Sequence, residues 1–289
     1  MIRAFLFLTL LLAQPGDALR LEWENIAGAV QAKVGAAAMV LETREACELQ
    51  GDARFPMQSV YKFPIAMAVL HAVDTGALSL DAKILVLKSD LVPQGLRSPI
   101  RDRHPQGNVS LTLGEILRLA VSESDGTASD VLLRLAGGPQ RVTSFLRGLG
   151  VEGMMVATSE REMARAEDVQ YRNSATPKSA VKLLRLFYQG KDLSAASRTL
   201  LLQWMTETQT GSHRLKGMLP PGTAVAHKTG TSGTVGELTA ATNDIGLITL
   251  PDGRHLAIAV FVSDARAQES ARESVIARIA RSAWDHWVH

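Results

Sequence analysis

Cysteine is nearly missing from this sequence of 289 residues: Cys47 is the only one, which excludes a disulfide within the chain. Excess charge is missing too, because 31 Lys and Arg residues offset 29 Asp and Glu residues to a net charge of +2. Binding to nucleic acid therefore has no electrostatic support. The sequence shows no internal repeat and no low-complexity tract, which excludes a repeat architecture. No apolar run reaches the length that a membrane-spanning helix requires.

The first 18 residues have the features of an export signal. Arg3 supplies a positive charge, residues 4–13 form an apolar stretch, and Gly16 and Ala18 put small residues at the two positions that a signal peptidase reads. The sequence predicts a signal peptide over 1–18, cleaved near Ala18, and an exported protein that is periplasmic or secreted. No cysteine lies near the cleavage site, so we expect no stable membrane anchor.

Strand patterns occur at both ends of the chain, and each end also carries a helical pattern, at 19–34 and at 266–288. The last two candidate strands flank a Pro-Asp-Gly-Arg turn, which is typical of a hairpin. The candidate strands are 36–43 and a short segment through Leu49 near the start, and 223–229, 245–250 and 255–262 near the end.

The middle of the chain has mainly helical patterns. Residues 152–175 show no period, so we interpret them as a long loop, and long loops in compact domains tend to be functional. The expected helices are 111–121 opened by Ser110, 127–136, 140–149, 177–188 and 194–206.

These patterns predict an α+β fold in which an antiparallel sheet is built from both ends of the chain and helices pack on it. We expect 19–58 and 207–289 to form an α/β lobe and 59–206, which includes the long loop, to form an inserted all-helical lobe. A site between two lobes is the default place for a pocket.

Ser59 and Lys62 stand at the start of an apolar stretch, 63–70, that reads as a buried helix. Residues three apart share one face of a helix, so the hydroxyl and the amine would lie side by side. A serine hydroxyl is a poor nucleophile until a neighbouring group takes its proton, and a desolvated lysine can do that. A second copy of this spacing, Ser179 and Lys182, reads as an ordinary capped helix start.

Two further motifs follow in order: Ser124-Asp125-Gly126 between two expected helices, and Lys228-Thr229-Gly230 at the end of an expected strand. With Ser59-x-x-Lys62 and with Glu160 in the long loop, they resemble the signature of the class A serine β-lactamases. The longer stretches that carry the resemblance, most like the PER-type extended-spectrum branch, are 55–62, 215–220 and 227–233.

The resemblance implies a β-lactamase/D,D-peptidase-like fold with a sheet of about five strands, and a role for each motif residue. Ser59 would attack the β-lactam carbonyl to form an acyl-enzyme, and Lys62, or Glu160 through a water, would take its proton. Ser124 would give a proton to the departing ring nitrogen. Glu160 would then activate the water that hydrolyses the acyl-enzyme. Glu162 and Glu167 lie in the same loop and remain alternatives for this role.

The resemblance also implies a set of substrate-binding residues. The backbone N–H groups of Ser59 and Thr231 would form the oxyanion hole. Lys228 and Thr229 would hold the substrate carboxylate, and Arg214 lies where one branch of the family places a carboxylate-binding arginine. The full set is Lys228, Thr229, Gly230, Thr231, Arg214 and Gly126.

Three positions depart from the usual family pattern. Gly126 replaces the asparagine that bonds the substrate's side-chain amide, and Ala164 replaces an asparagine that helps to hold the deacylating water. Arg97 stands where an aromatic residue usually lines the entrance of the site. These departures concern substrate preference more than reaction type.

The resemblance implies small-molecule β-lactam substrates, penicillins and cephalosporins, for a monomer without a cofactor or metal. Two other functions share some of these motifs. One is a peptidoglycan D,D-peptidase, which has the serine, lysine and Lys-Thr-Gly elements but lacks the loop glutamate. The other is a penicillin-sensing domain whose acyl-enzyme does not turn over.

Overall fold

The computed structural model describes residues 15–288. Helix α1 (Pro15–Gly28) begins three residues before Ala18, so cleavage there would remove its first turn. The rest of the expected signal peptide, residues 1–14, lies outside the described residues, and the export signal stays a prediction. No helix within 15–288 combines the length and the apolar character that crossing a membrane requires.

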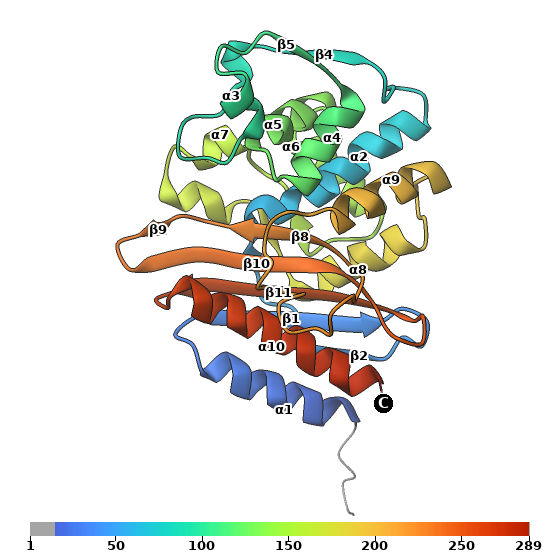
Figure 1. The fold of residues 1–289 in the computed structure, drawn as a ribbon, viewed down its shortest axis with the longest axis vertical. Helices are drawn as coiled ribbons and strands as arrows, with labels where there is room; N and C mark the ends of the chain where they lie inside the picture. The colour runs from blue at the N-terminus through green and yellow to red at the C-terminus, as the bar shows by residue number, and fades with distance from the viewer. Residues whose placement is uncertain (1–14, 289) are drawn as a thin grey trace, which may run out of the picture.

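The main sheet is antiparallel and takes its strands from both ends of the chain, as the sequence predicts (Figure 1). Its strand order is β2–β1–β11–β10–β8, and the short β9 pairs with β10. Strands β10 and β11 are buried along nearly their whole length, because other layers cover both faces of the sheet. The bounds are β1 (Lys33–Val40), β2 (Ala46–Leu49), β8 (Val225–Thr231), β9 (Thr234–Val235), β10 (Leu238–Thr249) and β11 (His255–Ala265).

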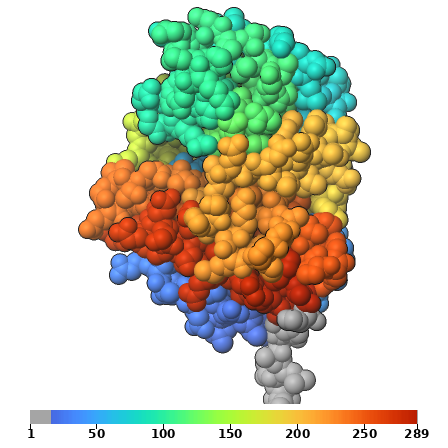
Figure 2. Space-filling view, in the orientation of Figure 1, coloured from blue at the N-terminus to red at the C-terminus, as the bar shows by residue number. Residues whose placement is uncertain are grey.

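One face of the sheet is covered by α1 and by α10 (Glu269–Val288), which lie side by side in Figure 1. Their apolar side chains and those of the sheet form one buried cluster. Within it, Trp23 Nε1 donates to Ser282 Oγ at 2.9 Å, which joins the two helices. The connection between residues 207 and 224, gold to orange in Figure 2, crosses this side of the molecule, and Leu215 is buried in the same cluster.

The other face carries the helical part of the chain, arranged around α2 (Lys62–Asp74). Helix α8 lies directly on β1 and β11. A second and larger buried cluster joins the sheet to these helices, so that α2 is enclosed by apolar side chains. The helices around α2 are α4 (Leu113–Ser122), α5 (Gly126–Leu135), α6 (Pro139–Gly148), α8 (Pro177–Tyr188) and α9 (Ala195–Thr206).

Side-chain caps fix where two of these helices begin. Thr112 accepts the Glu115 N–H at 3.1 Å while Glu115 accepts the Thr112 N–H, so α4 opens after Thr112 and not at Ser110. Ser110 belongs instead to a strand. Thr176 caps α8, as its position before Pro177 suggests.

The helical part also carries short strands that the sequence patterns did not indicate. Strands β4 (Lys83–Val86) and β5 (Val109–Thr112) pair with each other, and α3 (Pro99–Arg103) lies between them in the sequence. The division of the chain into two lobes stays a prediction. The remaining short elements are β3 (Phe55–Pro56), η1 (Gln58–Tyr61), η2 (Lys88–Asp90), β6 (Met154–Met155), α7 (Glu160–Met163), η3 (Glu167–Tyr171) and β7 (Ser174–Ala175).

The expected loop at 152–175 is a folded segment whose two ends are tied together by one side chain. Asn173 Oδ1 accepts the N–H groups of Ala157 at 2.7 Å and Thr158 at 3.0 Å, and Asn173 Nδ2 donates to the Thr158 carbonyl. Asn173 is fully buried, so this amide satisfies backbone groups that water cannot reach. Because Asn173 ties the two ends of this segment together, α7 and η3 hold a defined position beside α2.

Strand β8 approaches the turn before α2 so closely that only glycine fits at one position. A Cβ added at Gly230 would lie 2.3 Å from the Met57 carbonyl oxygen. Asn243 Nδ2, on the neighbouring β10, donates to the carbonyls of Pro56 at 2.8 Å and Met57 at 3.2 Å. The sheet and the start of α2 are thus held in direct contact.

We predict that Gly230→Ala lowers the free energy of unfolding by about 1 to 3 kcal/mol, because β8 must move away from Met57 to admit the methyl group. Urea unfolding of the purified variant measures this. Gly233→Ala is the matched control, since nothing lies within 4 Å of a Cβ added there. Equal stability of the two variants would show that the close approach is not enforced by packing.

Candidate active site

Ser59 and Lys62 lie where the chain turns from the sheet into the central helix. Ser59 is half-buried in η1, and Lys62 is the first residue of α2 with only 2% of its surface exposed. The Lys62 Nζ donates to Ser59 Oγ at 3.0 Å. The two side chains therefore sit side by side, as the spacing in the sequence predicts.

Glu160 is the loop glutamate that reaches this pair. Its Oε1 lies 2.9 Å from Lys62 Nζ, and both side chains are at least nine-tenths buried. Glu160 is the first residue of α7, in the segment 152–175. A buried carboxylate and a buried amine at this distance stabilise each other's charge, since burial leaves both groups little contact with water.

The two alternative glutamates do not contact Lys62. Glu162 is exposed and forms a reciprocal cap with Ser159 at the start of α7: it accepts the Ser159 N–H at 2.9 Å and donates its own N–H to Ser159 Oγ at 3.2 Å. These bonds lower the pKa of Glu162. Glu167 is exposed on η3. Of the three, Glu160 alone forms an ion pair with Lys62.

Ser124 lies between two buried lysines. Its carbonyl accepts from Lys62 Nζ at 2.8 Å, and its Oγ accepts from Lys228 Nζ at 3.0 Å. The backbone of Ser124 is left-handed, with φ of 58°, which turns both groups toward the lysines. Burial lowers the pKa of Lys228 well below its ordinary range, and the nearby charge of Lys62 adds to the shift.

The loop that presents Ser124 is held by the next residue. Asp125 Oδ1 accepts the Ala128 N–H at 2.8 Å as the cap of α5, and Asp125 Oδ2 accepts the Ile100 N–H at 2.6 Å. Ser98 also donates to Asp125 Oδ1. Asp125 is fully buried, so it orders this loop and does not contact the site itself.

The Lys-Thr-Gly motif lies on β8. Thr231, the residue that follows the motif, is exposed toward the cleft described below. Thr229 Oγ1 lies 2.6 Å from Thr210 Oγ1. Arg214, only 4% exposed, lies behind the strand: it donates to the Gly230 carbonyl at 3.2 Å and to Thr231 Oγ1 at 2.9 Å. Its charge is paired with Glu273 at 3.0 Å.

A cleft of about 380 Å³ joins these elements. Ser59, Lys62, Ser124, Glu160 and Thr231 all line it. The other expected binding residues, Lys228, Thr229, Gly230, Arg214 and Gly126, are not among the residues that line it. Its further lining residues are Gln58, Gly95, Leu96, Arg97, Met163, Gln170, Ser232 and Gly233.

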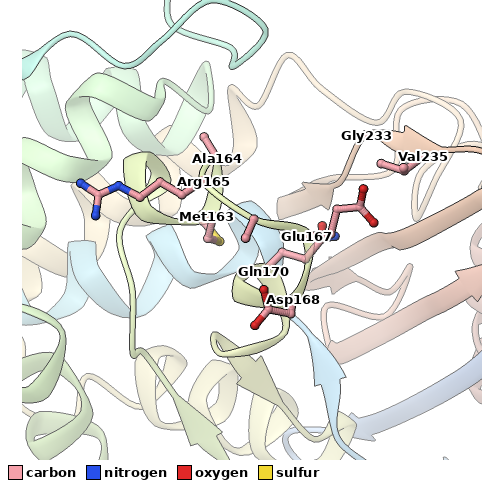
Figure 3. A pocket seen from close by; sticks show the side chains of 9 residues that line it. Met163, Ala164, Arg165, Glu167, Asp168, Gln170, Gly233 and Val235 are labelled. Carbon is pink, nitrogen blue, oxygen red and sulfur yellow. The ribbon is translucent and has the colours of Figure 1, made fainter.

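A larger cavity of about 700 Å³ opens beside the cleft, between the loop and the turn after β8 (Figure 3). It shares Met163, Gln170 and Gly233 with the cleft but none of the residues that meet at Lys62. Gln58 Nε2 donates to Gln170 Oε1 at 2.8 Å and so ties the start of α2 to the loop. The cavity therefore extends the site without containing its reactive groups.

Sequence reasoning missed a buried pair between β8 and β10. His227 Nδ1 lies 2.8 Å from Asp244 Oδ2, and both side chains are completely buried. The negative charge of Asp244 acts on the neighbouring Lys228 in the direction that raises its pKa, which partly offsets burial. No local pattern marks this pair, because its members lie on different strands.

No group of three or more His, Cys, Asp or Glu side chains within residues 15–288 is arranged to hold a metal ion. The polar groups in the cleft are instead arranged for proton transfer and hydrogen bonding. Burial raises the pKa of the Tyr61 hydroxyl well above its ordinary range, and the charges of Glu160 and Asp130 add to the shift. Tyr61 accordingly stays a neutral acceptor for Ser129.

Asp130 positions the backbone at the start of α7. Its two carboxylate oxygens accept the N–H groups of Glu160 at 2.8 Å and Arg161 at 3.1 Å, at the start of α7. Burial raises the pKa of Asp130 from 3.8 to about 6, and repulsion from the Glu160 charge contributes. The folded protein therefore binds more protons here than the unfolded chain does between pH 4 and pH 6.

We predict that the wild-type protein loses stability relative to Asp130→Asn as pH rises from 4 to 7, by up to about 3 kcal/mol, because only the wild type must ionise this carboxyl. Urea unfolding of both proteins at the two pH values measures the difference. A difference that does not change with pH would show that Asp130 titrates normally in the folded protein.

Comparison with known proteins agrees with this geometry. Residues 18–287 match a family described as the β-lactamase enzyme family. The β-lactamase VEB-1 of Pseudomonas aeruginosa is 42% identical over 275 residues, which cover 94% of this chain and 91% of that protein. The extended-spectrum β-lactamase PER-1 of Pseudomonas aeruginosa is 41% identical over 261 residues, or 90% of this chain and 84% of that protein.

The fold agrees as well. The crystal structure of the TLA-1 extended-spectrum β-lactamase superposes with a TM-score of 0.93 at 45% identity, and covers 96% of this chain and 100% of that chain. The expected fold class, a β-lactamase fold with an antiparallel sheet flanked by helices, is confirmed. The chain therefore belongs to the β-lactamase enzyme family, as a class A enzyme similar to the PER-type extended-spectrum branch.

Proposed function

We propose that this enzyme hydrolyses β-lactams through an acyl-enzyme on Ser59, which a water activated by Glu160 then cleaves. The observation that carries the proposal is the convergence on one atom: Lys62 Nζ lies 3.0 Å from Ser59 Oγ, 2.8 Å from the Ser124 carbonyl and 2.9 Å from Glu160 Oε1. The nucleophilic hydroxyl of Ser59 and the carboxylate of Glu160 thus contact the same buried amine.

In the acylation step, Ser59 Oγ forms a bond to the β-lactam carbonyl carbon while its proton leaves. Lys62, whose Nζ lies 3.0 Å from Ser59 Oγ, takes this proton, or Glu160 takes it through a water. The backbone N–H groups of Ser59 and Thr231 stabilise the developing oxyanion.

Ring opening breaks the bond between the carbonyl carbon and the ring nitrogen, which must gain a proton. Ser124 Oγ supplies it, and the Ser124 hydroxyl is replenished from the lysines at 3.0 Å and 3.5 Å. Lys228 and Thr229 hold the carboxylate of the substrate by charge and hydrogen bonding.

In the deacylation step, Glu160 acts as the general base that takes a proton from the attacking water. This step distinguishes the hydrolase from a D,D-peptidase, which shares the serine and lysine but lacks the loop glutamate, and from a sensor domain, whose acyl-enzyme does not turn over. The ion pair of Glu160 with Lys62 in the cleft favours the hydrolase.

We also propose that the enzyme is exported and acts as a monomer on small β-lactams, penicillins and cephalosporins. The charged start, apolar stretch and small residues within 1–18 support export. The cleft and its adjoining cavity, about 380 Å³ and 700 Å³, are of the size that small ligands occupy.

We predict that Glu160→Gln forms the acyl-enzyme but hydrolyses it roughly a hundredfold or more slowly, because the amide cannot accept a proton from water. Intact-mass spectrometry after mixing with a chromogenic cephalosporin should show one substrate mass added per protein. Ser59→Ala should show no adduct.

Glu162→Gln is the matched control for this experiment, because glutamine preserves the cap at the start of α7. It should turn over like the wild type. Wild-type turnover in Glu160→Gln, or an adduct that accumulates in Glu162→Gln instead, would show that Glu160 is not the deacylating glutamate.

A further inference from the structure

Arg97 is an exposed cation on the wall of the cleft. It lines the same cleft as Ser59, Ser124 and Thr231, on the segment that precedes α3. An aromatic residue at this place would offer only a flat apolar surface, whereas a guanidinium offers a charge and a planar set of donors.

The backbone of Arg97 is fixed to the loop that presents Ser124. Its carbonyl accepts the Gly126 N–H at 2.9 Å. The next residue, Ser98, is completely buried and donates to Thr127 Oγ1 at 2.8 Å. Arg97 is therefore held at a set position relative to the reactive serines, not at the tip of a free loop.

The side chain is anchored at one nitrogen and leaves the others available. Arg97 Nε donates to the Glu123 carbonyl at 2.6 Å. The Glu123 carboxylate is already paired, with Arg103 at 2.8 Å and Arg118 at 3.1 Å. Arg97 forms no ion pair with any residue in the described part of the chain.

The other two charged side chains that line the cleft compensate each other. Lys62 and Glu160 pair with each other, and both are buried. Lys228 lies behind the wall and donates to Ser124 and to the Thr229 carbonyl. Glu167 and Asp168 line the adjoining cavity but not the cleft. An anionic group that enters the cleft would thus find Arg97 without a competing carboxylate partner.

We propose that Arg97 binds a second carboxylate, carried on the acyl side chain of a β-lactam, and so makes the enzyme selective for dianionic substrates. This inference rests on the proposed function, in which Lys228 and Thr229 hold the first carboxylate, attached to the ring system. The free edge of a guanidinium anchored through Nε matches the two oxygens of a carboxylate.

The test compares benzylpenicillin with α-carboxybenzylpenicillin, which differ by one carboxylate. In Arg97→Gln, the ratio of kcat/KM for the dianionic to the monoanionic penicillin should fall about fivefold, the size expected for an exposed charge pair. The loss should lie mainly in KM. Arg97→Lys should keep part of the preference, and added salt should weaken it in the wild type.

Arg165→Gln is the matched control, because it removes the same charge from the rim of the adjoining cavity while the Arg165 side chain points away from that cavity (Figure 3). Its ratio should stay within twofold of the wild type. An equal loss for both penicillins in Arg97→Gln, an unchanged ratio, or the same change in Arg165→Gln would each overturn the proposal.

Failure of the proposed function gives a different result, namely that the wild type cleaves neither penicillin. The Kd ratio of the two penicillins, measured by calorimetry on Ser59→Ala with and without Arg97→Gln, then decides on Arg97 alone. A fall of about fivefold in that ratio supports the carboxylate contact, and an unchanged ratio contradicts it.

Discussion

The rest of the site depends on the contacts that the buried amine of Lys62 makes. It is 2% exposed and cannot be solvated, so its charge must be met by protein groups. Ser59 Oγ, the Ser124 carbonyl and Glu160 Oε1 meet it within 3.0 Å. These partners come from the start of α2, the loop before α5 and the helix α7, so a single amine requires three separate segments to be in place.

The fold supplies that placement through carboxylates that hold backbone rather than substrate. Asp125 accepts N–H groups from α3 and α5 and fixes the loop of Ser124. Asp130 accepts the N–H groups of Glu160 and Arg161 and fixes α7. Arg214 works in a similar way behind β8, where it binds Thr231 and the Gly230 carbonyl. Ser124, Glu160 and Thr231 are thus each held by a charged side chain that makes several hydrogen bonds, which is how a site is kept rigid.

Patterns of short range let the sequence predict much of this arrangement. The spacing of Ser59 and Lys62 fixes their contact, and Thr176 before Pro177 fixes the start of α8. Strand patterns at both ends of the chain indicate the sheet. The pairing of β4 with β5 was not predicted, because each strand has only four residues. More than twenty residues, which include η2 and α3, separate the two strands.

Contacts between distant segments could not be predicted from one sequence. His227 and Asp244 pair across neighbouring strands, and neither residue stands in a pattern that indicates the other. The place of Arg214 behind β8 follows from Asn243 and Glu273, which reach it from β10 and α10. Glu160 and Glu162 lie at the start of the same short helix, and only the fold shows which of them contacts Lys62.

A crystal structure of Glu160→Gln soaked with a cephalosporin tests the central claim most directly. The account predicts continuous density from Ser59 Oγ to the opened β-lactam, with the acyl carbonyl oxygen within hydrogen-bond distance of the Ser59 and Thr231 N–H groups. Lys62 should still contact both Ser59 and Ser124. Density on any other side chain, for example on Ser179 of the second Ser-x-x-Lys segment, or an intact ring in the cleft after full exposure, would contradict it.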